Sequence, residues 1–314
     1  MTRNAIIMAA GMSSRFAPLS LETPKALLNV KDEIMIERQI GQLREAGIDE
    51  IVIVVGYLKE KFEYLKEKYH VILVENPYYK QMNNFSTLYV AREYLKNTWI
   101  CSADNYFTEN VFMEESENAF YASEYADGAT EEWCIKTDNT GKIIGVQIGG
   151  ENAWVMKGHV FFNEKFSTQL LPYLEEAFQK KELWDEYWEN LYMAHMDEME
   201  MYIRKYDVGI IEEFDSIDEL REFDVKYKEC TGSKVLREVS EKLNCPEGKM
   251  TQMKPVKSNG DVIGFEFLCD GKKYEYSYTS GLKTRKVGKE SKWKRNRQNR
   301  QRKRRLTGLL HYCH

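Results

Sequence analysis

The sequence predicts an α/β fold: a mixed, mainly parallel sheet with helices on both faces, followed by a small α+β appendage. Short continuous apolar runs, typical of strands buried on both faces, alternate with amphipathic stretches over roughly the first hundred residues. Such β-α-β order favours parallel strands with covering helices. After Asp104 the apolar runs follow one another more directly, which is typical of a mixed sheet.

The first half of the chain supplies four predicted strands with helices between them. The strands span residues 4–10, 50–57, 71–76 and 98–106, and the helices span residues 34–47, 59–69 and 84–95. Ligands of parallel sheets bind beyond the carboxyl ends of the strands. We therefore expect one crevice to collect the residues that lie at these ends: Gly11, Gly56, Asn76 and Asp104.

The second half completes a main domain that we assign to residues 1–228. It supplies predicted strands at residues 119–125, 132–138, 142–149 and 153–162, helices at 164–181 and 183–196, and extended segments at 200–206 and 209–215. A last helix begins after Ser216, because a serine followed three residues later by Glu219 is a helix-capping pattern.

The remainder of the chain divides into two parts. Residues 229–280 predict one helix and a β-hairpin with Asp270 and Gly271 at its turn. Residues 281–314 contain 13 Lys and Arg and one acid, which predicts a basic, disordered tail. This leaves 32 bases and 49 acids in residues 1–280, a net charge of -17. A body so acidic must concentrate positive charge locally if it is to handle an anionic substrate.

Composition points to a cytoplasmic protein. No apolar run reaches the ~18 residues needed to span a bilayer, and the first residues lack the pattern of a secretory signal. The six cysteines are scattered without a C-x-x-C pair, so we expect free thiols rather than disulfides or metal ligands. No arrangement of histidine with serine or cysteine indicates a covalent nucleophile, and we predict no specific nucleic-acid partner.

The most specific motif is AAGMSSRFAPLSLETPKALLNV, which runs from Ala9 to Val30 directly after the first strand. A glycine-bearing loop at this place lets backbone N–H groups approach phosphate oxygens. The motif is neither a Walker A sequence nor the dinucleotide-binding G-x-G-x-x-G. It resembles the opening motif A-A-G-x-x-[ST]-R-x-x-P-[LM]-T-x-x-x-P-K of nucleotidyltransferases with the glycosyltransferase-A-like fold, with Ser20 where threonine is common. The resemblance implies a Rossmann-like fold and the joining of a nucleoside triphosphate to a phosphorylated partner.

Six shorter motifs follow along the chain: GYLKEKFEYLKEKYHVILVENPYY, NNFSTLY, ADNY, EEW, DEYWEN and FDSIDELREF. In this order they resemble bacterial CTP:phosphocholine cytidylyltransferases, over about residues 3–228. The resemblance implies transfer of CMP from CTP to phosphocholine, which gives CDP-choline and pyrophosphate with Mg²⁺ as cofactor. Arg15 and Lys25 would neutralise the triphosphate, and Asp104 and Asp215 would bind Mg²⁺. The nucleotide would contact Ala9, Ala10, Gly11 and Asn84, although Asn84 is equally suited to cap a helix.

The acceptor pocket depends on aromatic residues, because a quaternary ammonium is held by aromatic faces and a nearby carboxylate. The resemblance implies Trp133 and Tyr187 as walls of this pocket, with Asp185 or Glu189 as the acid. The helical spacing of Trp184, Trp188 and Tyr192 instead predicts a core face.

Two alternatives stay open at this point. In the first, the same fold acts on 2-aminoethylphosphonate, phosphoethanolamine or a sugar 1-phosphate as acceptor. In the second, the protein is a catalytically silent binding or scaffold protein.

Residues 229–280 also resemble the first strands of bacterial choline kinases. The chain leaves no room for a kinase's catalytic loop, so we expect no kinase activity.

Overall fold

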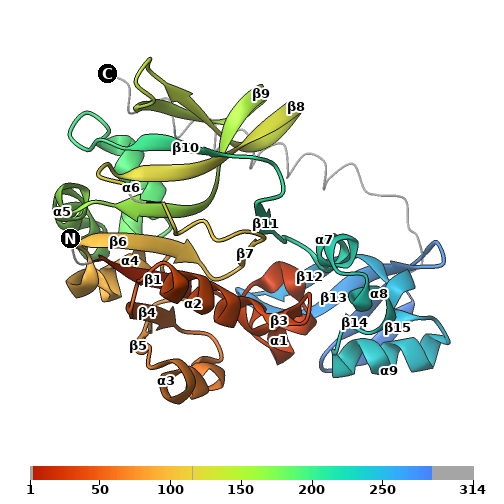
Figure 1. The fold of residues 1–314 in the computed structure, drawn as a ribbon. Helices are drawn as coiled ribbons and strands as arrows, with labels where there is room; N and C mark the ends of the chain where they lie inside the picture. Colours follow the sequence, from red (N-terminus) through yellow and green to blue (C-terminus); the bar gives the residue numbers. More distant parts are fainter. Residues whose placement is uncertain (1–2, 115, 285–314) are drawn as a thin grey trace.

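The computed structural model describes residues 3–114 and 116–284, and its centre is a seven-stranded sheet (Figure 1). The strands lie in the order β10-β8-β9-β6-β1-β4-β5. Their bounds are β1 (Arg3–Ala9), β4 (Glu50–Val55), β5 (Ile72–Glu75), β6 (Asn97–Ser102), β8 (Phe120–Thr137), β9 (Ile143–Phe162) and β10 (Tyr202–Tyr206). Strands β6, β1, β4 and β5 are parallel, whereas β9 runs antiparallel to both β6 and β8. The mixed, mainly parallel sheet predicted from the sequence is confirmed.

Helices cover both faces of this sheet, because the side chains of its strands alternate between two cores. On one face, Ile7 and Ile53 pack with Ile40 and Leu43 of α2 (Met35–Glu45). On the other face, Ile6 and Val54 pack beneath α4 (Phe85–Val90), α5 (Glu164–Gln179) and α6 (Trp188–Ala194). A further helix beside these is α3 (Tyr64–Tyr69). Short 3-10 turns occupy η3 (Lys59–Phe62), η4 (Arg92–Tyr94) and η5 (Lys181–Leu183).

Two predicted pairs of strands prove to be single long strands. β8 runs unbroken through residues 126–131, and β9 runs unbroken through residues 150–152. Several register shifts interrupt their pairing, and Gly128 and Gly149 have left-handed backbones with φ of +78° and +77°. The strands therefore bend at these small residues instead of ending there.

The predicted helix at 183–196 begins five residues late, at Trp188. Its first backbone N–H is held by a side chain from another element, as described below. The predicted helix cap at Ser216 is confirmed, because the Ser216 side chain accepts a hydrogen bond from the Glu219 N–H at the start of α7 (Ile217–Phe223).

The C-terminal part is larger than the predicted helix and hairpin. Helix α9 (Lys234–Leu243) precedes a four-stranded antiparallel sheet. Its strands are β12 (Thr251–Ser258), β13 (Asp261–Cys269), β14 (Lys272–Ser277) and β15 (Gly281–Thr284). Asp270 and Gly271 form the turn between β13 and β14 as predicted, while residues 281–284, assigned to the tail, form β15. The rest of the predicted basic tail lies outside the described residues.

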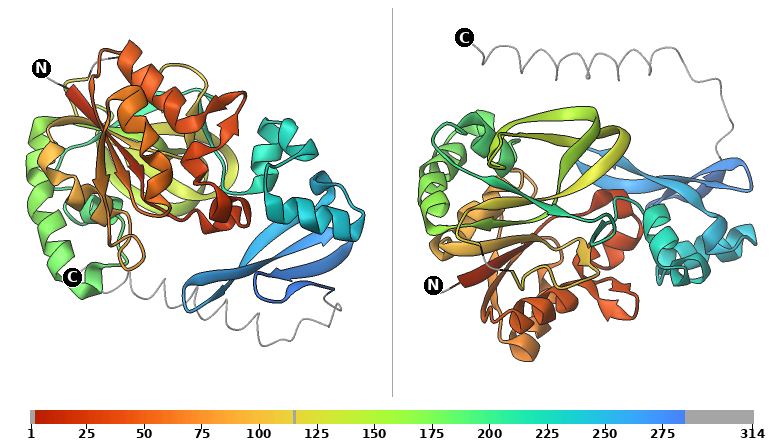
Figure 2. Two further views of the ribbon diagram at one scale, coloured as in Figure 1. Left: turned by 90° about the horizontal axis from the view of Figure 1, so that it is seen from below. Right: turned by 45° about the horizontal axis from the view of Figure 1, so that its top comes forward.

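A third core joins this part to the start of the chain. Phe16, Leu19 and Leu28 of the opening motif pack with Leu236 and Phe265. The motif is folded into four short pieces: η1 (Ser14–Phe16), α1 (Leu19–Glu22), η2 (Lys25–Leu27) and β2 (Asn29–Val30). Strand β3 (Glu33–Ile34) follows the motif and pairs with β2. Helix α8 (Lys226–Glu229) contacts η6 (Glu247–Lys249) of the C-terminal part. Figure 2 shows the C-terminal sheet, in blue, beside these first residues, in red.

Candidate active site

A cleft of about 250 Å³ opens where β1 and β6 end. It is lined by residues from both halves of the opening motif and from two later loops. Seven residues singled out by the sequence line it together: Ala9, Ala10, Gly11, Lys25, Asn76, Asn84 and Asp104. The topology explains this convergence, because β1 is the central neighbour of both β4 and β6 and all three end at the same edge.

Gly56 allows the walls of the cleft to meet. It follows β4, and the next residue, Tyr57, donates its N–H to the Ala10 carbonyl at 3.1 Å. A Cβ at Gly56 would lie 2.9 Å from that carbonyl oxygen and 2.9 Å from the Tyr79 ring. Any side chain here would push Tyr79 or the opening loop away, so this glycine is required by close approach.

The two predicted cations differ in their surroundings: Lys25 lines this cleft, whereas Arg15 is not one of its lining residues. Lys25 is 5% exposed, and its Nζ lies 3.0 Å from Asp104 Oδ2 and 4.9 Å from the centre of the Phe16 ring. Arg15 forms an ion pair with Asp215, but its side chain is 68% exposed. Exposed ion pairs contribute about 0–1 kcal/mol, so the Arg15 arm can exchange Asp215 for an anionic ligand at little cost.

A third carboxylate, Glu213, stands between the two predicted metal ligands. Strand β11 (Ile211–Glu213) pairs with β7 (Asn105–Phe107), and this register sets Glu213 opposite Asn105, next to Asp104. Desolvation, and then the charges of Asp104 and Asp215, raise the pKa of Glu213, while Lys25 opposes the shift. Sequence reasoning missed Glu213, although its place two residues before Asp215 in an extended segment puts both side chains on one face.

Side chains from neighbouring elements fix the backbone on which these acids stand. The buried Gln39 of α2 donates its Nε2 to the carbonyls of Ser102, at 2.9 Å, and Asn105, at 2.7 Å. These carbonyls bracket Asp104. The Asp215 N–H donates to Glu219 Oε2 at 2.6 Å. The backbone at both acids is therefore held by Gln39 and Glu219, which do not line the cleft.

The predicted acceptor residues form a second cluster beside the cleft. The rings of Trp133 and Tyr187 meet edge to face with centroids 5.9 Å apart. Glu189 accepts hydrogen bonds from Asn84 Nδ2 at 3.1 Å and from the Tyr121 hydroxyl at 3.3 Å. Burial raises the pKa of Glu189 to about 7, against the opposing effect of these donors. Tyr187 and Glu189 stand two positions apart at the start of α6, so one wall of the aromatic pair and the acid come from the same stretch of chain.

Asn84 joins the two sites. It lines the cleft, while its Oδ1 accepts the Trp188 N–H at 2.8 Å and its Nδ2 binds Glu189. Its side chain therefore caps α6, and this contact explains why that helix begins at Trp188. The Asp185 side chain is exposed, and the Asp185 carbonyl accepts from Asn83 Nδ2 at 2.9 Å. Trp188 and Tyr192 are fully buried in the core as predicted, with Trp184 packed against them.

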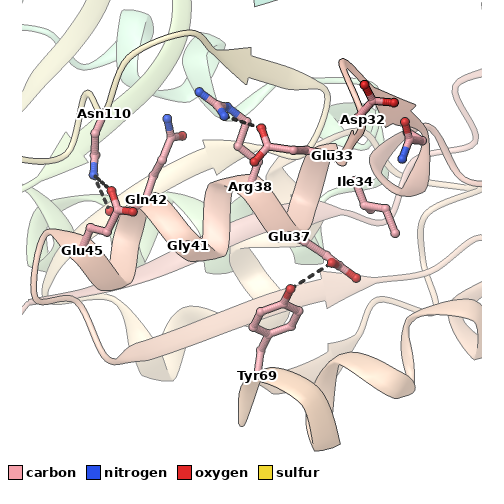
Figure 3. Close-up of a pocket in the computed structure, with 11 residues that line it drawn as sticks. Asp32, Glu33, Ile34, Glu37, Arg38, Gly41, Gln42, Glu45, Tyr69 and Asn110 are labelled. Atoms are coloured by element: carbon pink, nitrogen blue, oxygen red, sulfur yellow. Dashed lines mark hydrogen bonds and ion pairs between the residues drawn. The ribbon is translucent and has the colours of Figure 1, made fainter.

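A larger groove of about 610 Å³ runs along α2, away from these residues (Figure 3). Its acids are engaged within the groove: Glu33 pairs with Arg38, Glu45 accepts from Asn110 at 3.1 Å, and Glu37 accepts from Tyr69 at 2.9 Å. Arg38 also donates to the Phe107 carbonyl at 2.9 Å. Helix α2 thus holds β7 through Arg38, which also lines the groove. Because Arg38 is already paired with Glu33, the described residues that line the groove offer no free cation of the kind a triphosphate needs.

The cysteines differ in part from expectation. Cys245 and Cys269 form a disulfide, so the prediction of free thiols is wrong for this pair, whereas Cys101, Cys134 and Cys230 are free. Cys245 and Cys269, together with Asp270, make up the one three-residue cluster of potential metal ligands among residues 3–114 and 116–284. Because the two sulfurs are bonded to each other, the cluster offers no thiolates. His159 is buried among aromatic rings, and burial lowers its pKa to about 3.

Comparisons with known proteins agree with this fold. Residues 5–182 match the family model described as a MobA-like NTP transferase domain. A choline-phosphate cytidylyltransferase from Streptococcus pneumoniae is 36% identical over 220 residues, which cover 70% of this chain and 96% of the relative. A 2-aminoethylphosphonate cytidylyltransferase from Lancefieldella rimae is 37% identical over 228 residues, which cover 71% and 93%.

A solved structure of the CTP:phosphocholine cytidylyltransferase from Streptococcus pneumoniae aligns with a TM-score of 0.69 at 35% identity, covering 72% of this chain and 99% of that one. The chain is a nucleotidyltransferase and belongs to the MobA-like NTP transferase family. Nearly the whole of each relative is matched by about seven tenths of this chain, so the chain carries a further part that they lack.

Proposed function

We propose that this enzyme transfers CMP from CTP to phosphocholine and releases CDP-choline and pyrophosphate. The observation that carries the proposal is the edge-to-face pair of Trp133 and Tyr187 with Glu189 beside a cleft that holds Lys25 and Asp104. An aromatic pair and a carboxylate suit a quaternary ammonium, which offers no N–H group to donate. The names of two relatives, at 36% and 31% identity, support the same acceptor.

The reaction needs positioning more than covalent catalysis. A phosphate oxygen of the acceptor attacks the α-phosphorus of CTP in line, a new P–O bond forms, and the bond to the β-phosphate oxygen breaks. Lys25, already buried and positive, neutralises charge that develops on the transferred group. Arg15 leaves Asp215 and stabilises the departing pyrophosphate. The backbone of Ala9, Ala10 and Gly11 contacts the nucleotide, and a Cβ at Gly11 would meet nothing within 4 Å, so Gly11 faces open space.

The donor set fits magnesium. Asp104 and Asp215 offer carboxylate oxygens, the ligands that Mg²⁺ prefers, and Glu213 adds a third acid close enough to feel the charge of both. We infer that Asp104 and Asp215 hold Mg²⁺. When bound, the ion would neutralise triphosphate oxygens and orient them for attack. Desolvation is the first cause of the raised pKa of Glu213, and the negative charges of Asp104 and Asp215, which a cation would offset, add to it.

A second acceptor is favoured by one specific observation. Glu189 is an enclosed carboxylate with an unusually high pKa, and a primary ammonium would donate N–H groups to it directly. The relative named 2-aminoethylphosphonate cytidylyltransferase matches over as much of its length as the choline-type relative. Choice between the two acceptors rests on whether the aromatic pair or the acid dominates binding.

Pyrophosphate release measured with CTP and Mg²⁺ decides between them. The panel is phosphocholine, 2-aminoethylphosphonate, phosphoethanolamine and glucose 1-phosphate, each with wild type, Trp133→Ala and Trp154→Ala. Trp154 lies on the same hairpin and packs on Tyr125, so it controls for loss of an aromatic. We expect phosphocholine to be preferred, with KM raised about tenfold in Trp133→Ala alone, as for loss of a desolvated cation–π contact. Preference for a primary amine in wild type would refute phosphocholine and leave the transfer chemistry standing.

We place the reaction in the cytoplasm, where CTP is made and used. Within residues 3–114 and 116–284, the structure has no helix with the length and apolar content of a membrane span.

A further inference from the structure

We propose that the C-terminal part, residues 229–284, acts as a clamp that holds the opening motif in its nucleotide-binding shape, with Glu22 as the positioning residue. The inference rests on the proposed function, because it takes the cleft to be the CTP site. It concerns a part of the chain beyond the seven tenths that match the relatives.

The clamp and the motif share one hydrophobic core. Phe16 is 1% exposed, and it packs with apolar residues of α9 and β13 while β12 contacts η1. The other face of the same ring lies 4.9 Å from Lys25 Nζ. Arg15 precedes Phe16 in η1, and Ser13 before it has a left-handed backbone with φ of 44°. A shift of Phe16 would therefore move both cations of the cleft.

Glu22 supplies the polar part of this contact. Its carboxylate accepts from Ser233 Oγ at 2.5 Å and from the N–H groups of Lys234 and Val235 at 2.8 and 3.3 Å. These donors form the start of α9, so the acid of one part caps a helix of the other. Helix starts favour negative charge, and three donors on one carboxylate fix the end of α1 in place. Glu22 lies three residues before Lys25, so this anchor limits how far the lysine can move.

The clamp also reaches the opposite wall of the cleft. Asp261, at the β12–β13 turn, forms an ion pair with Lys80 at 3.4 Å. Tyr278 of the clamp packs on Phe265 of the shared core, with ring centroids 6.4 Å apart. Tyr57 holds the Ala10 carbonyl, and Tyr79 next to Lys80 lines the cleft. One compact part thus contacts the loop on one side of the nucleotide cleft and the residues on the other.

This arrangement predicts linkage between nucleotide binding and clamp contact. If CTP needs the loop in its clamped shape, weakening the clamp lowers the fraction of molecules ready to bind, and apparent affinity falls by that fraction. The acceptor cluster around Trp133 and Glu189 makes none of these contacts. Weakening the clamp should therefore change the KM for CTP and leave the KM for the acceptor unchanged.

The test compares Glu22→Gln with Glu238→Gln in the full chain. The amide keeps the shape of Glu22 but removes its charge. Glu238 lies on α9 in an exposed pair with Lys242, so it is a matched acid on the clamp without a contact to the motif. CTP binding is measured by calorimetry, KM is measured for CTP and for phosphocholine, and amide hydrogen exchange is followed for residues 11–18 without nucleotide.

We expect Glu22→Gln to weaken CTP binding about fivefold or more, the low end of typical site-to-site couplings. Exchange of residues 11–18 should accelerate, and the KM for phosphocholine should not change. Glu238→Gln should match wild type in all measurements. Unchanged CTP affinity in Glu22→Gln, or an equal rise in both KM values, would overturn the clamp. Failure of wild type to bind CTP would instead remove the proposed function, and the clamp with it.

Discussion

Glu189 gives the sharpest test of the acceptor site, because its environment makes folding stability depend on pH. Its pKa is about 7 in the folded protein, against 4.5 for an ordinary glutamate. The folded protein thus holds this proton more tightly than the unfolded chain does. The resulting stabilisation is fully present below about pH 4.5 and is lost as pH rises through about 7. Between about pH 5 and pH 8 the loss amounts to roughly 2 kcal/mol.

Glu189→Gln should remove this dependence. A glutamine cannot ionise, so the variant should gain roughly 2 kcal/mol relative to wild type when both are moved from about pH 5 to pH 8. Asn84 and Tyr121 both donate to Glu189, and rearranging one of these bonds costs about 1 kcal/mol. That cost is the same at both pH values and cancels in the comparison.

Urea unfolding at the two pH values measures the effect, with the exposed Glu182→Gln as control. The same substitution should weaken binding of phosphocholine, and wild-type affinity should rise with pH as Glu189 ionises. The reasoning fails if wild type and Glu189→Gln lose stability in parallel between the two pH values.

Three further changes test the cleft. Lys25→Met should lower kcat about a hundredfold or more in the pyrophosphate assay, since it removes a preorganised charge and leaves Asp104 unpaired. Gln39→Met keeps the buried volume but strips the donors from the carbonyls on either side of Asp104, so it should raise the Mg²⁺ concentration needed for half-maximal rate about tenfold. A lower unfolding midpoint with unchanged Mg²⁺ dependence would make Gln39 merely structural. Arg15→Ala should raise the KM for CTP about tenfold with little change in unfolding free energy, because its ion pair is exposed.

The sequence predicts the parallel half of the fold well because its strands are continuous apolar runs. It predicts the long hairpin poorly, since Gly128 and Gly149 look like strand ends but act as bends within paired strands. The C-terminal sheet carries a signal that could have revealed it. Asn259 and Gly260, with φ of 51° and 88°, form the Asn-Gly turn that is typical of a two-residue hairpin.

The candidate site divides in the same way. The opening motif identifies Arg15 and Lys25 because their spacing is local, and the cleft gathers the neighbouring residues as expected. Glu213 reaches Asp104 through pairing between β7 and β11, about a hundred residues apart, so its only local sign is its place two residues before Asp215. Asn84 likewise caps a helix 104 positions later, so its contact is invisible before the chain is folded.

The charges of the cleft also explain how an acidic protein handles CTP. Without substrate, Lys25 pairs with Asp104 and Arg15 pairs with Asp215, and the neighbouring acids raise the pKa of Glu213. Asp104 and Asp215 are the groups proposed to bind Mg²⁺. When the metal and the triphosphate bind, each charged side chain therefore exchanges one partner of opposite charge for another, and no unpaired charge is added. Lysine and arginine are freed for phosphate as the acids turn to the metal. The exchange costs little for Arg15, which is exposed, and more for Lys25, which is buried. Lys25 is therefore the cation whose position must be set in advance, and it is the one that lies against Phe16 and the shared core.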